Sequence, residues 1–235
     1  MSILTWFADK FGKSSPVPAR RSTGYFAAEY SRITTSLVSE ARHINEIIRW
    51  QGYTLMARSR QLADNNPYAS KFLRMVVNNI CGPQPFTLQG RIKTAKKAPD
   101  DFANQAIENA WTGWSRPDAC DFIGRLSLND IFRLACRTIA RDGECFIRIH
   151  EGVNAGPYGI QLQMIDTDRI DFNLNKQLAG GNVIHAGIEV DIYGRTVAYH
   201  VSKRRPVQWQ TGFRTAGYER VPAEQMIHLF VPLSA

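Results

Sequence analysis

Three aspartates close together are the residues whose types and spacing could most directly perform chemistry. Asp166, Asp168 and Asp171 directly follow residues 160–165, which alternate between apolar and polar side chains like a strand. Carboxylates at the end of a strand can hold Mg²⁺ for phosphoryl chemistry. The same Asp-x-Asp pattern also caps turns through side chain to backbone hydrogen bonds. The spacing of the three aspartates lacks the regular series of ligand positions found in an EF-hand calcium loop. We therefore favour a turn-capping role over a metal site.

Histidines and cysteines offer a second possible constellation. His185, His200 and His228 fall on separate predicted strands and could converge, although a single histidine in an alternating strand is usually a half-buried sheet residue. No GxxxxGK[ST] or GxGxxG nucleotide loop occurs. The four cysteines are far apart and form no CxxC pair, which indicates buried free thiols of a reducing compartment. They are Cys81, Cys120, Cys136 and Cys145. We therefore predict no catalytic residue, no metal site and no cofactor.

Positive charge is concentrated in the first half of the chain. The 235 residues carry a net charge of +8. Residues 1–115 hold 15 Lys and Arg against 8 Asp and Glu, whereas residues 116–235 hold 14 against 13. An anionic partner would meet the first half, and a solvated basic face is the alternative. The candidate contact with DNA is a small basic cluster, although a solvated loop is the interpretation we favour for it. Its members are Arg91, Lys93, Lys96 and Lys97.

The positions of these groups depend on a predicted corner between two helices. Asn66 is a good N-cap and Pro67 a good first helical residue, so one helix ends near Asn65 and another begins there. The second helix has an apolar face at spacings of three and four, and Gly82 can take the left-handed position at its end. That face comprises Tyr68, Phe72, Met75, Val76, Asn79 and Ile80.

Further helices are expected on both sides of this corner. Residues 25–63 have a mostly helical pattern, with a possible loop at residues 31–39. Residues 100–114 begin with acidic side chains, which suit the N-terminal end of a helix dipole. Apolar or aromatic side chains line one side of that helix: Phe102, Ala106, Ala110, Trp111 and Trp114. Ser127 caps another helix that Gly143 ends. Its expected buried face is Leu128, Ile131, Phe132, Ala135, Cys136 and Ile139.

Strands dominate the second half of the sequence. A period of two predicts strands at residues 145–150, 160–165, 183–190, 196–201 and 226–231, and an isolated one at residues 85–92. Short strands separated by tight turns form antiparallel pairs instead of βαβ units. We therefore expect an α+β fold, with a helical N-terminal half followed by a mostly antiparallel, sheet-rich region.

The N-terminal residues contain one short apolar pattern and no membrane signal. Ile3, Trp6, Phe7 and Phe11 could form one face of an amphipathic helix, which we expect to pack on its own domain or to fray. Residues 12–21 are basic and contain proline, so an extended or flexible segment is expected. No apolar run approaches the roughly 20 residues of a membrane-spanning helix, and no signal peptide is indicated.

An ordered set of short segments resembles the lambda-type family of tailed-phage portal proteins. Each segment alone is weak, but together they follow the family's order across residues 49–235. They are residues 62–69 (LADNNPYA), 79–82 (NICG), 140–146 (ARDGECF), 162–168 (LQMIDTD), 186–200 (AGIEVDIYGRTVAYH) and 221–230 (VPAEQMIHLF).

The resemblance implies a structural role in a virion and no enzymatic activity. Portal proteins form a ring, usually of twelve subunits, at one vertex of the capsid. The ring is the conduit for DNA packaging and ejection. The implied partners are other copies of the chain, major capsid and scaffold proteins, the large terminase subunit, head-completion and tail connector proteins, and double-stranded DNA bound non-specifically, with no membrane. Assembly is expected in the bacterial host cytoplasm.

The family also implies how the chain is divided. Its members are considerably longer, so we expect this sequence to stop before the stem and the clip. Residues 1–48 would be a basic, helical arm, residues 49–142 a helical region with one short strand, and residues 143–235 the sheet-rich part of a portal wing.

Two alternatives from other classes stay open. The first is a metal-dependent nuclease or phosphodiesterase that uses Asp166, Asp168 and Asp171. The second is a basic nucleic-acid-binding module, whose affinity would fall steeply with salt.

Overall fold

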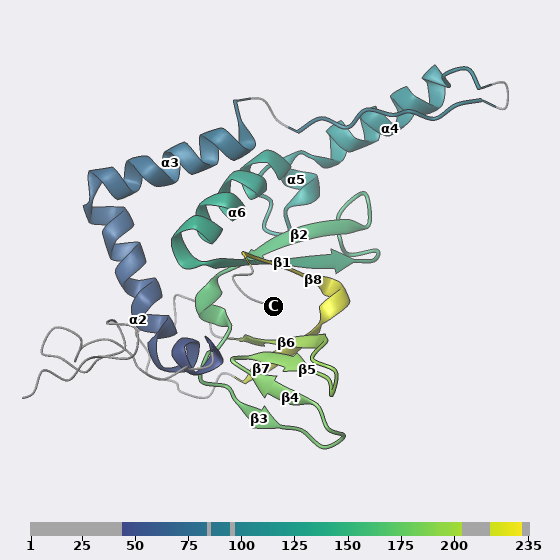
Figure 1. Ribbon diagram of the computed structural model, residues 1–235. Helices are drawn as coiled ribbons and strands as arrows, with labels where there is room; N and C mark the ends of the chain where they lie inside the picture. Colours follow the sequence, from purple (N-terminus) through teal and green to yellow (C-terminus); the bar gives the residue numbers. More distant parts are fainter. Residues whose placement is uncertain (1–43, 84–85, 95–96, 204–216, 232–235) are drawn as a thin grey trace, which may run out of the picture. The chain divides into compact units, whose positions relative to one another are not determined.

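The computed structural model describes residues 44–83, 86–94, 97–203 and 217–231 (Figure 1). The expected N-terminal helix face, the basic segment at residues 12–21 and the possible loop at residues 31–39 lie outside these ranges. Among the described residues, none of the helices combines the length and the apolar character that crossing a membrane requires.

The predicted helix corner is confirmed. Helix α2 (Ile44–Asn65) ends directly before Asn66, and helix α3 (Pro67–Cys81) begins directly after it. The Asn66 side-chain oxygen accepts hydrogen bonds from the backbone N–H groups of Tyr68 and Ala69, at 2.9 and 3.3 Å. Gly82 follows α3 with a φ of 68° and a ψ of −178°. The positive φ agrees with the prediction, but this ψ lies outside the left-handed helical well.

The side of α3 that is buried in the structure differs from the apolar side predicted from the sequence. Leu73 and Cys81 are its buried residues, and α3 packs against α6 (Leu128–Asp142). The predicted apolar face lies largely outside the core: Tyr68, Phe72 and Met75 are all at least half exposed. The helix is therefore apolar on two sides, and only one side is covered by described residues of this chain.

The strand predicted at residues 85–92 is wrong over its described part. Residues 86–92 form no strand, because they run beside helix α4 (Asp101–Trp114) and not beside another extended chain. Side chains of α4 take the backbone hydrogen bonds that a neighbouring strand would take. Glu108 accepts from the Gly90 N–H at 2.8 Å, and Asn104 accepts from the Ile92 N–H and donates to its carbonyl, at 2.8 and 3.2 Å.

Helix α6 follows the predicted pattern closely. Ser127 and Asp130 form a capping box at its start, and Gly143 ends it in the left-handed conformation with a φ of 93°. Leu128, Ile131 and Ala135 are buried as expected, together with Thr138. A short helix, α5 (Pro117–Cys120), precedes α6 and was not predicted.

Two antiparallel sheets make up the second half of the described chain, as the α+β prediction requires. The first has the order β2-β1-β8, and the second has the order β3-β4-β5-β6-β7. The bounds of the first sheet are β1 (Glu144–Glu151), β2 (Ile160–Ile165) and β8 (Met226–Phe230). Those of the second are β3 (Lys176–Gln177), β4 (Val183–His185), β5 (Ile188–Val190), β6 (Thr196–Ser202) and β7 (Tyr218–Pro222). Two 3₁₀ turns, η2 (Thr167–Arg169) and η4 (Ala223–Gln225), follow β2 and β7.

One predicted strand is divided into two. Residues 183–190 form the hairpin of β4 and β5, which turns at Ala186 and Gly187, both with positive φ. A Cβ on Gly187 would lie 2.9 Å from the Ile170 side chain, so a larger residue would collide there. Strands β3 and β7 were not predicted, because the first has only two residues and the second interrupts its apolar alternation with Glu219 and Arg220.

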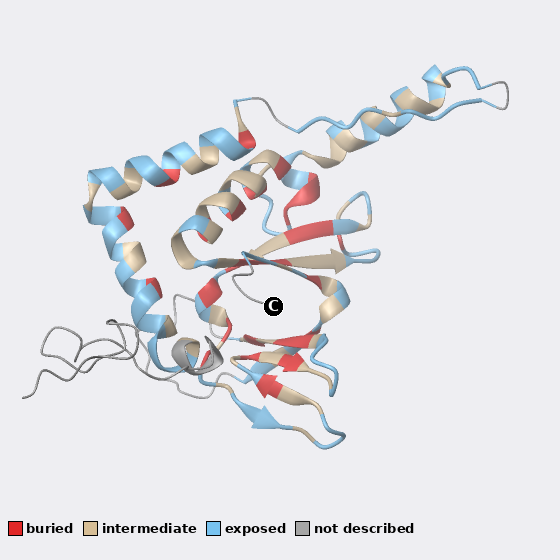
Figure 2. Cartoon of the chain, viewed as in Figure 1, coloured by how far each residue is buried: buried red, intermediate tan, exposed pale blue. Residues whose placement is uncertain are grey.

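Both faces of β1 are buried over residues 145–147, whereas residues 148–150 are intermediate and Figure 2 draws much of the strand in tan. Cys145 and Ile147 belong to a core cluster with Ile131 of α6, while Phe146 between them belongs to a second cluster with Tyr199 of β6. Successive residues of a strand point to opposite faces, so β1 contributes alternate side chains to the two cores. The first sheet thus lies between helix α6 and the second sheet.

The Asn66 cap gives the first testable prediction. Asn66→Ala should lower the free energy of unfolding by about 1 kcal/mol, since two N–H groups at the start of α3 lose their acceptor. Urea denaturation followed by circular dichroism measures the loss. Asn79→Ala is the matched control, because Asn79 is exposed within the same helix and caps nothing. Equal losses in the two variants would contradict the cap assignment.

Candidate functional site

The three aspartates after β2 have separate surroundings. Asp168 pairs with Arg60 of α2 at 2.8 Å. Asp171 accepts hydrogen bonds from the hydroxyl groups of Tyr53, at 2.9 Å, and Tyr218. Asp166 is exposed and makes no cap bond to η2. Two of the three carboxylates therefore connect elements of the fold. Asp171 also accepts a hydrogen bond from the Asn173 N–H at 2.9 Å, which is the side chain to backbone bond that the turn interpretation expects. Nowhere in the described ranges do three or more His, Cys, Asp or Glu residues group so that they could hold a metal ion.

The three histidines are not brought together as one constellation. His200 of β6 lies 3.2 Å from a carboxylate oxygen of Glu189, in the five-stranded sheet. His228 of β8 lies 2.9 Å from Glu144 and stacks on Phe146 with ring centroids 4.3 Å apart, in the other sheet. His185 is exposed on β4. The convergence considered from the sequence does not occur.

An ion network that the sequence analysis missed surrounds Asp142 at the end of α6. Arg60 donates to both carboxylate oxygens of Asp142, at 3.1 and 2.7 Å, and Arg141 does the same at 2.8 and 2.9 Å. The Asp142 side chain is fully buried. Burial alone would raise the pKa of Asp142, but the hydrogen bonds from Arg141 and Arg60 outweigh it and lower that pKa. Because Arg60 also holds Asp168, it joins α2, α6 and η2.

A second buried carboxylate connects strands of the five-stranded sheet. Glu189 is 3% exposed and accepts two hydrogen bonds from Arg220, at 2.8 and 3.1 Å. Asn182 donates to it at 2.9 Å, and His200 is its third partner. The Arg220 guanidinium, with help from Asn182 and His200, lowers the pKa of Glu189 to about 2 against the opposing effect of burial. No local pattern in the sequence links Glu189 to Arg220, since 31 positions separate them.

The predicted basic cluster lies in a short loop before α4. An antiparallel bridge between Lys93 and Pro99 closes the loop, and the Thr94 carbonyl accepts a hydrogen bond from the Lys97 N–H at 2.8 Å. Arg91, Lys93 and Lys97 are exposed, whereas Lys96 lies outside the described residues. The structure thus leaves the three described members accessible to an anionic partner.

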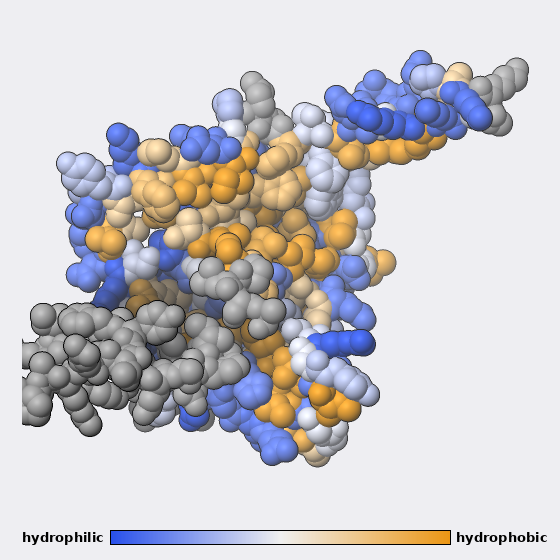
Figure 3. All heavy atoms as spheres, viewed as in Figure 1, coloured by the Kyte–Doolittle hydropathy of each residue, from blue (hydrophilic) through white to orange (hydrophobic). Residues whose placement is uncertain are grey.

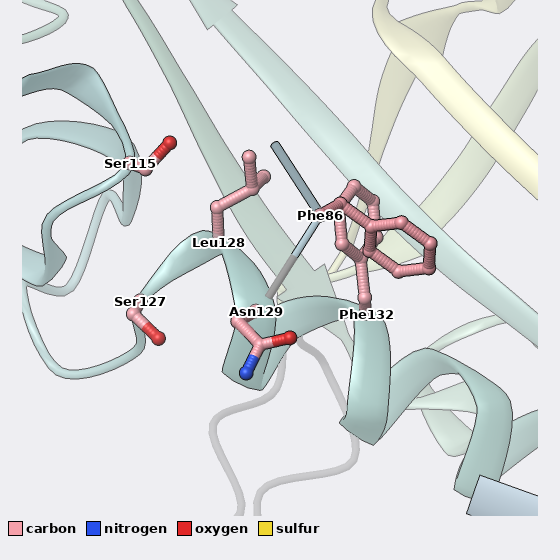
Figure 4. A pocket seen from close by; sticks show the side chains of 6 residues that line it. All are labelled: Phe86, Ser115, Ser127, Leu128, Asn129 and Phe132. Carbon is pink, nitrogen blue, oxygen red and sulfur yellow. The ribbon is translucent and has the colours of Figure 1, made fainter. Parts of the chain in front are cut away.

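A hollow of about 270 Å³ lies at the start of α6 (Figure 4). The rings of Phe86 and Phe132 meet edge to face on one side of it, with centroids 5.0 Å apart. Its two hydroxyl groups already have partners: Ser115 donates to the Trp111 carbonyl at 2.7 Å, and Ser127 to Asp130 at 2.6 Å. No histidine is among its lining residues.

Exposed apolar side chains gather over α3 and along one side of α4 (Figure 3). Tyr68 of α3 is 83% exposed and Phe102 of α4 is 88% exposed. Helix α4 has no buried residue, although Trp111 and Trp114 pack partly against the first core cluster. Contiguous exposed apolar patches on a folded chain commonly mark surfaces that bind another protein. These two helices are therefore candidate assembly surfaces.

The fold and these surfaces fit an assembly protein, and comparison with known families identifies its class. Residues 30–235 match the family described as phage portal protein, lambda family. The chain belongs to the lambda family of phage portal proteins. The resemblance seen in the short ordered segments is confirmed.

A curated relative supports the same assignment. The chain is 31% identical over 194 residues to the probable portal protein of Halomonas phage phiHAP-1. The aligned part covers 83% of this chain and 37% of that protein. The chain therefore spans well under half the length of this relative.

The Glu189 network gives a prediction about pH. The pKa of Glu189 is lower in the folded state than its ordinary value of 4.5, so its stabilisation is present above that value and is lost as pH falls towards about 2. Glu189→Gln should lower the free energy of unfolding by roughly 2–3 kcal/mol at pH 7. The loss should shrink as pH falls from about 4.5 towards about 2, because Glu189 of the unfolded wild-type chain takes up a proton in this window while Glu189 of the folded chain stays ionised.

Urea denaturation at several pH values measures this effect. Glu224→Gln is a suitable control, because Glu224 lies in η4 outside the network. A pH-independent difference between wild type and Glu189→Gln would contradict the role of the Glu189 charge.

Proposed function

We propose that this chain is part of a structural subunit of a portal ring at the capsid vertex. The ring would form the conduit for DNA packaging and ejection, and the docking point for terminase and for head–tail connector proteins. The observation that carries the proposal is the family match over residues 30–235. Exposed apolar faces on α3 and α4 support it, since a subunit of a ring needs surfaces for its neighbours.

The proposed role is structural and not enzymatic. In this proposal the acidic residues after β2 position elements of the wing, because Asp168 binds Arg60 and Asp171 binds Tyr53. Residues 1–48 are an N-terminal arm, residues 49–142 the helical region and residues 143–235 the sheet-rich part of the wing. The ring contains twelve copies and resides in the virion after assembly in the bacterial host cytoplasm, next to capsid, scaffold and connector proteins.

Double-stranded DNA is the proposed anionic partner, contacted non-specifically and weakly. A channel through which DNA slides requires scattered charge instead of a tight basic cleft, since binding to phosphates is electrostatic. The exposed positions of Arg91, Lys93 and Lys97 support a contact at this loop. Lys96 is included in the proposal because it lies between them in the sequence.

Ring assembly tests the proposed function. The full-length gene product should form ring-shaped particles in negative-stain images, and the rings should persist at about 1 M salt, because apolar contacts are not screened. The competing nuclease predicts a monomer that cleaves DNA with Mg²⁺ or Mn²⁺ and loses this activity in Asp166→Ala. Asp166 suits this comparison because it is exposed and caps nothing. A monomeric, metal-dependent nuclease would overturn the portal proposal.

The basic cluster gives a separate prediction. Replacing its four basic residues by glutamine should make the salt dependence of DNA binding shallower, by up to about 0.9 in the log–log slope for each phosphate that the loop no longer neutralises. Filter binding by the full-length protein at several salt concentrations measures the slope. A control removes the same charge at four exposed positions elsewhere: Arg58, Arg125, Lys176 and Arg195. Equal slopes for the two variants would show that the loop does not bind DNA.

A further inference from the structure

The outer side of α3 is an apolar surface that no described residue covers. Tyr68, Phe72 and Met75 are 83%, 58% and 50% exposed. Their spacings of four and three residues place them on one side of the helix. Leu73, which is 4% exposed, lies on the opposite side and anchors α3 to the protein. The exposure of the outer side is therefore not a consequence of a loosely attached helix.

Helix α4 has a second uncovered surface of a complementary shape. Phe102, Ala106 and Ala110 recur every four residues and are exposed, whereas Trp111 and Trp114 pack partly against the core. The two alanines leave a shallow strip along the helix beyond the large Phe102 ring. Small residues allow another helix to approach closely, and bulky side chains such as Phe72 can pack on them.

The charges of the two helices are also complementary. Helix α3 carries Lys71 and Arg74 and no acidic residue. Helix α4 carries Asp101 and Glu108 and no basic residue. Two copies of α3 would repel each other, and so would two copies of α4, whereas α3 and α4 attract. The helices are similar in length, with 15 and 14 residues.

We propose that the outer side of α3 in one copy of the chain docks on the exposed side of α4 in the next copy. This inference rests on the proposed ring. A closed ring uses a heterologous contact, in which two different patches of the same chain meet. The two patches described here differ in shape and in charge, as such a contact requires. Two helices of this length bury less than the roughly 1,200 Å² of a stable interface, so the contact is one part of a larger one.

Photo-crosslinking tests which surface meets α3. Benzoylphenylalanine replaces Phe72 in the full-length protein, and copies labelled with ¹⁴N and ¹⁵N are mixed before assembly. The expected product joins Phe72 to α4 in peptide pairs of mixed isotope, which only contacts between copies can produce. Crosslinks confined to residues 1–43, to other parts of the same copy or to another face of the neighbour would overturn the proposal. The same probe at Tyr193, which is 79% exposed in the turn between β5 and β6, is the control and should not reach α4.

Substitutions supply an independent measurement. Phe72→Ala with Phe102→Ala should raise the protein concentration at half-assembly about tenfold or more, because large aromatic anchors contribute most of an interface's energy. Lys71→Glu should weaken assembly, and Asp101→Lys in the same chain should restore part of it. Ile192→Ala with Tyr193→Ala is the control, since these residues are 69% and 79% exposed on another part of the chain.

The outcomes separate the two proposals. If the wild-type protein forms no ring, the proposed function fails. If it forms rings and the double alanine variant assembles at the wild-type concentration, the α3–α4 contact fails while the portal function stands.

Discussion

Burial of both faces of β1 at residues 145–147 is the constraint on which the rest of this structure depends. Its neighbouring residues Cys145 and Phe146 are both fully buried, yet they lie in different cores. One face requires the apolar side of α6, and the other requires the second sheet. Where both faces of a strand are buried, as at residues 145–147, the register of its neighbours is fixed, since a slip by one residue would exchange the two sets of side chains.

Charged groups also hold helices and strands together, in addition to the two apolar cores. Arg60 connects α2 to the end of α6 and to η2, and Glu189 connects strands of the second sheet through Arg220. Removing one partner of such a network would leave a buried charge without compensation, which costs more than the pair contributes. Asp168, which the sequence offered as a possible metal ligand, is instead a partner of Arg60 in the first of these networks.

The surface of α3 carries large apolar side chains that the packing of the interior does not explain. Helix α3 is anchored by Leu73 on one side and presents Tyr68, Phe72 and Met75 on the other. An isolated chain gains nothing from exposing such residues, whereas an assembly gains their burial at each repeated contact. The ring that we propose for this member of the lambda family of phage portal proteins would bury these exposed faces.

Interactions between residues close together in the sequence determine the helix ends and most strands, so these could be predicted from the sequence. The family could also be recognised from its short ordered segments. Asn66, Ser127 and Gly143 act through hydrogen bonds and backbone angles within a few residues, so their roles can be predicted without a structure. Only the tertiary structure decided which apolar side of α3 is buried, why residues 86–92 form no strand, and which basic residue holds Asp142 or Glu189. Apart from the adjacent pair Arg141 and Asp142, those outcomes depend on neighbours that are 12 to 82 positions away along the chain, and no local period encodes such distances.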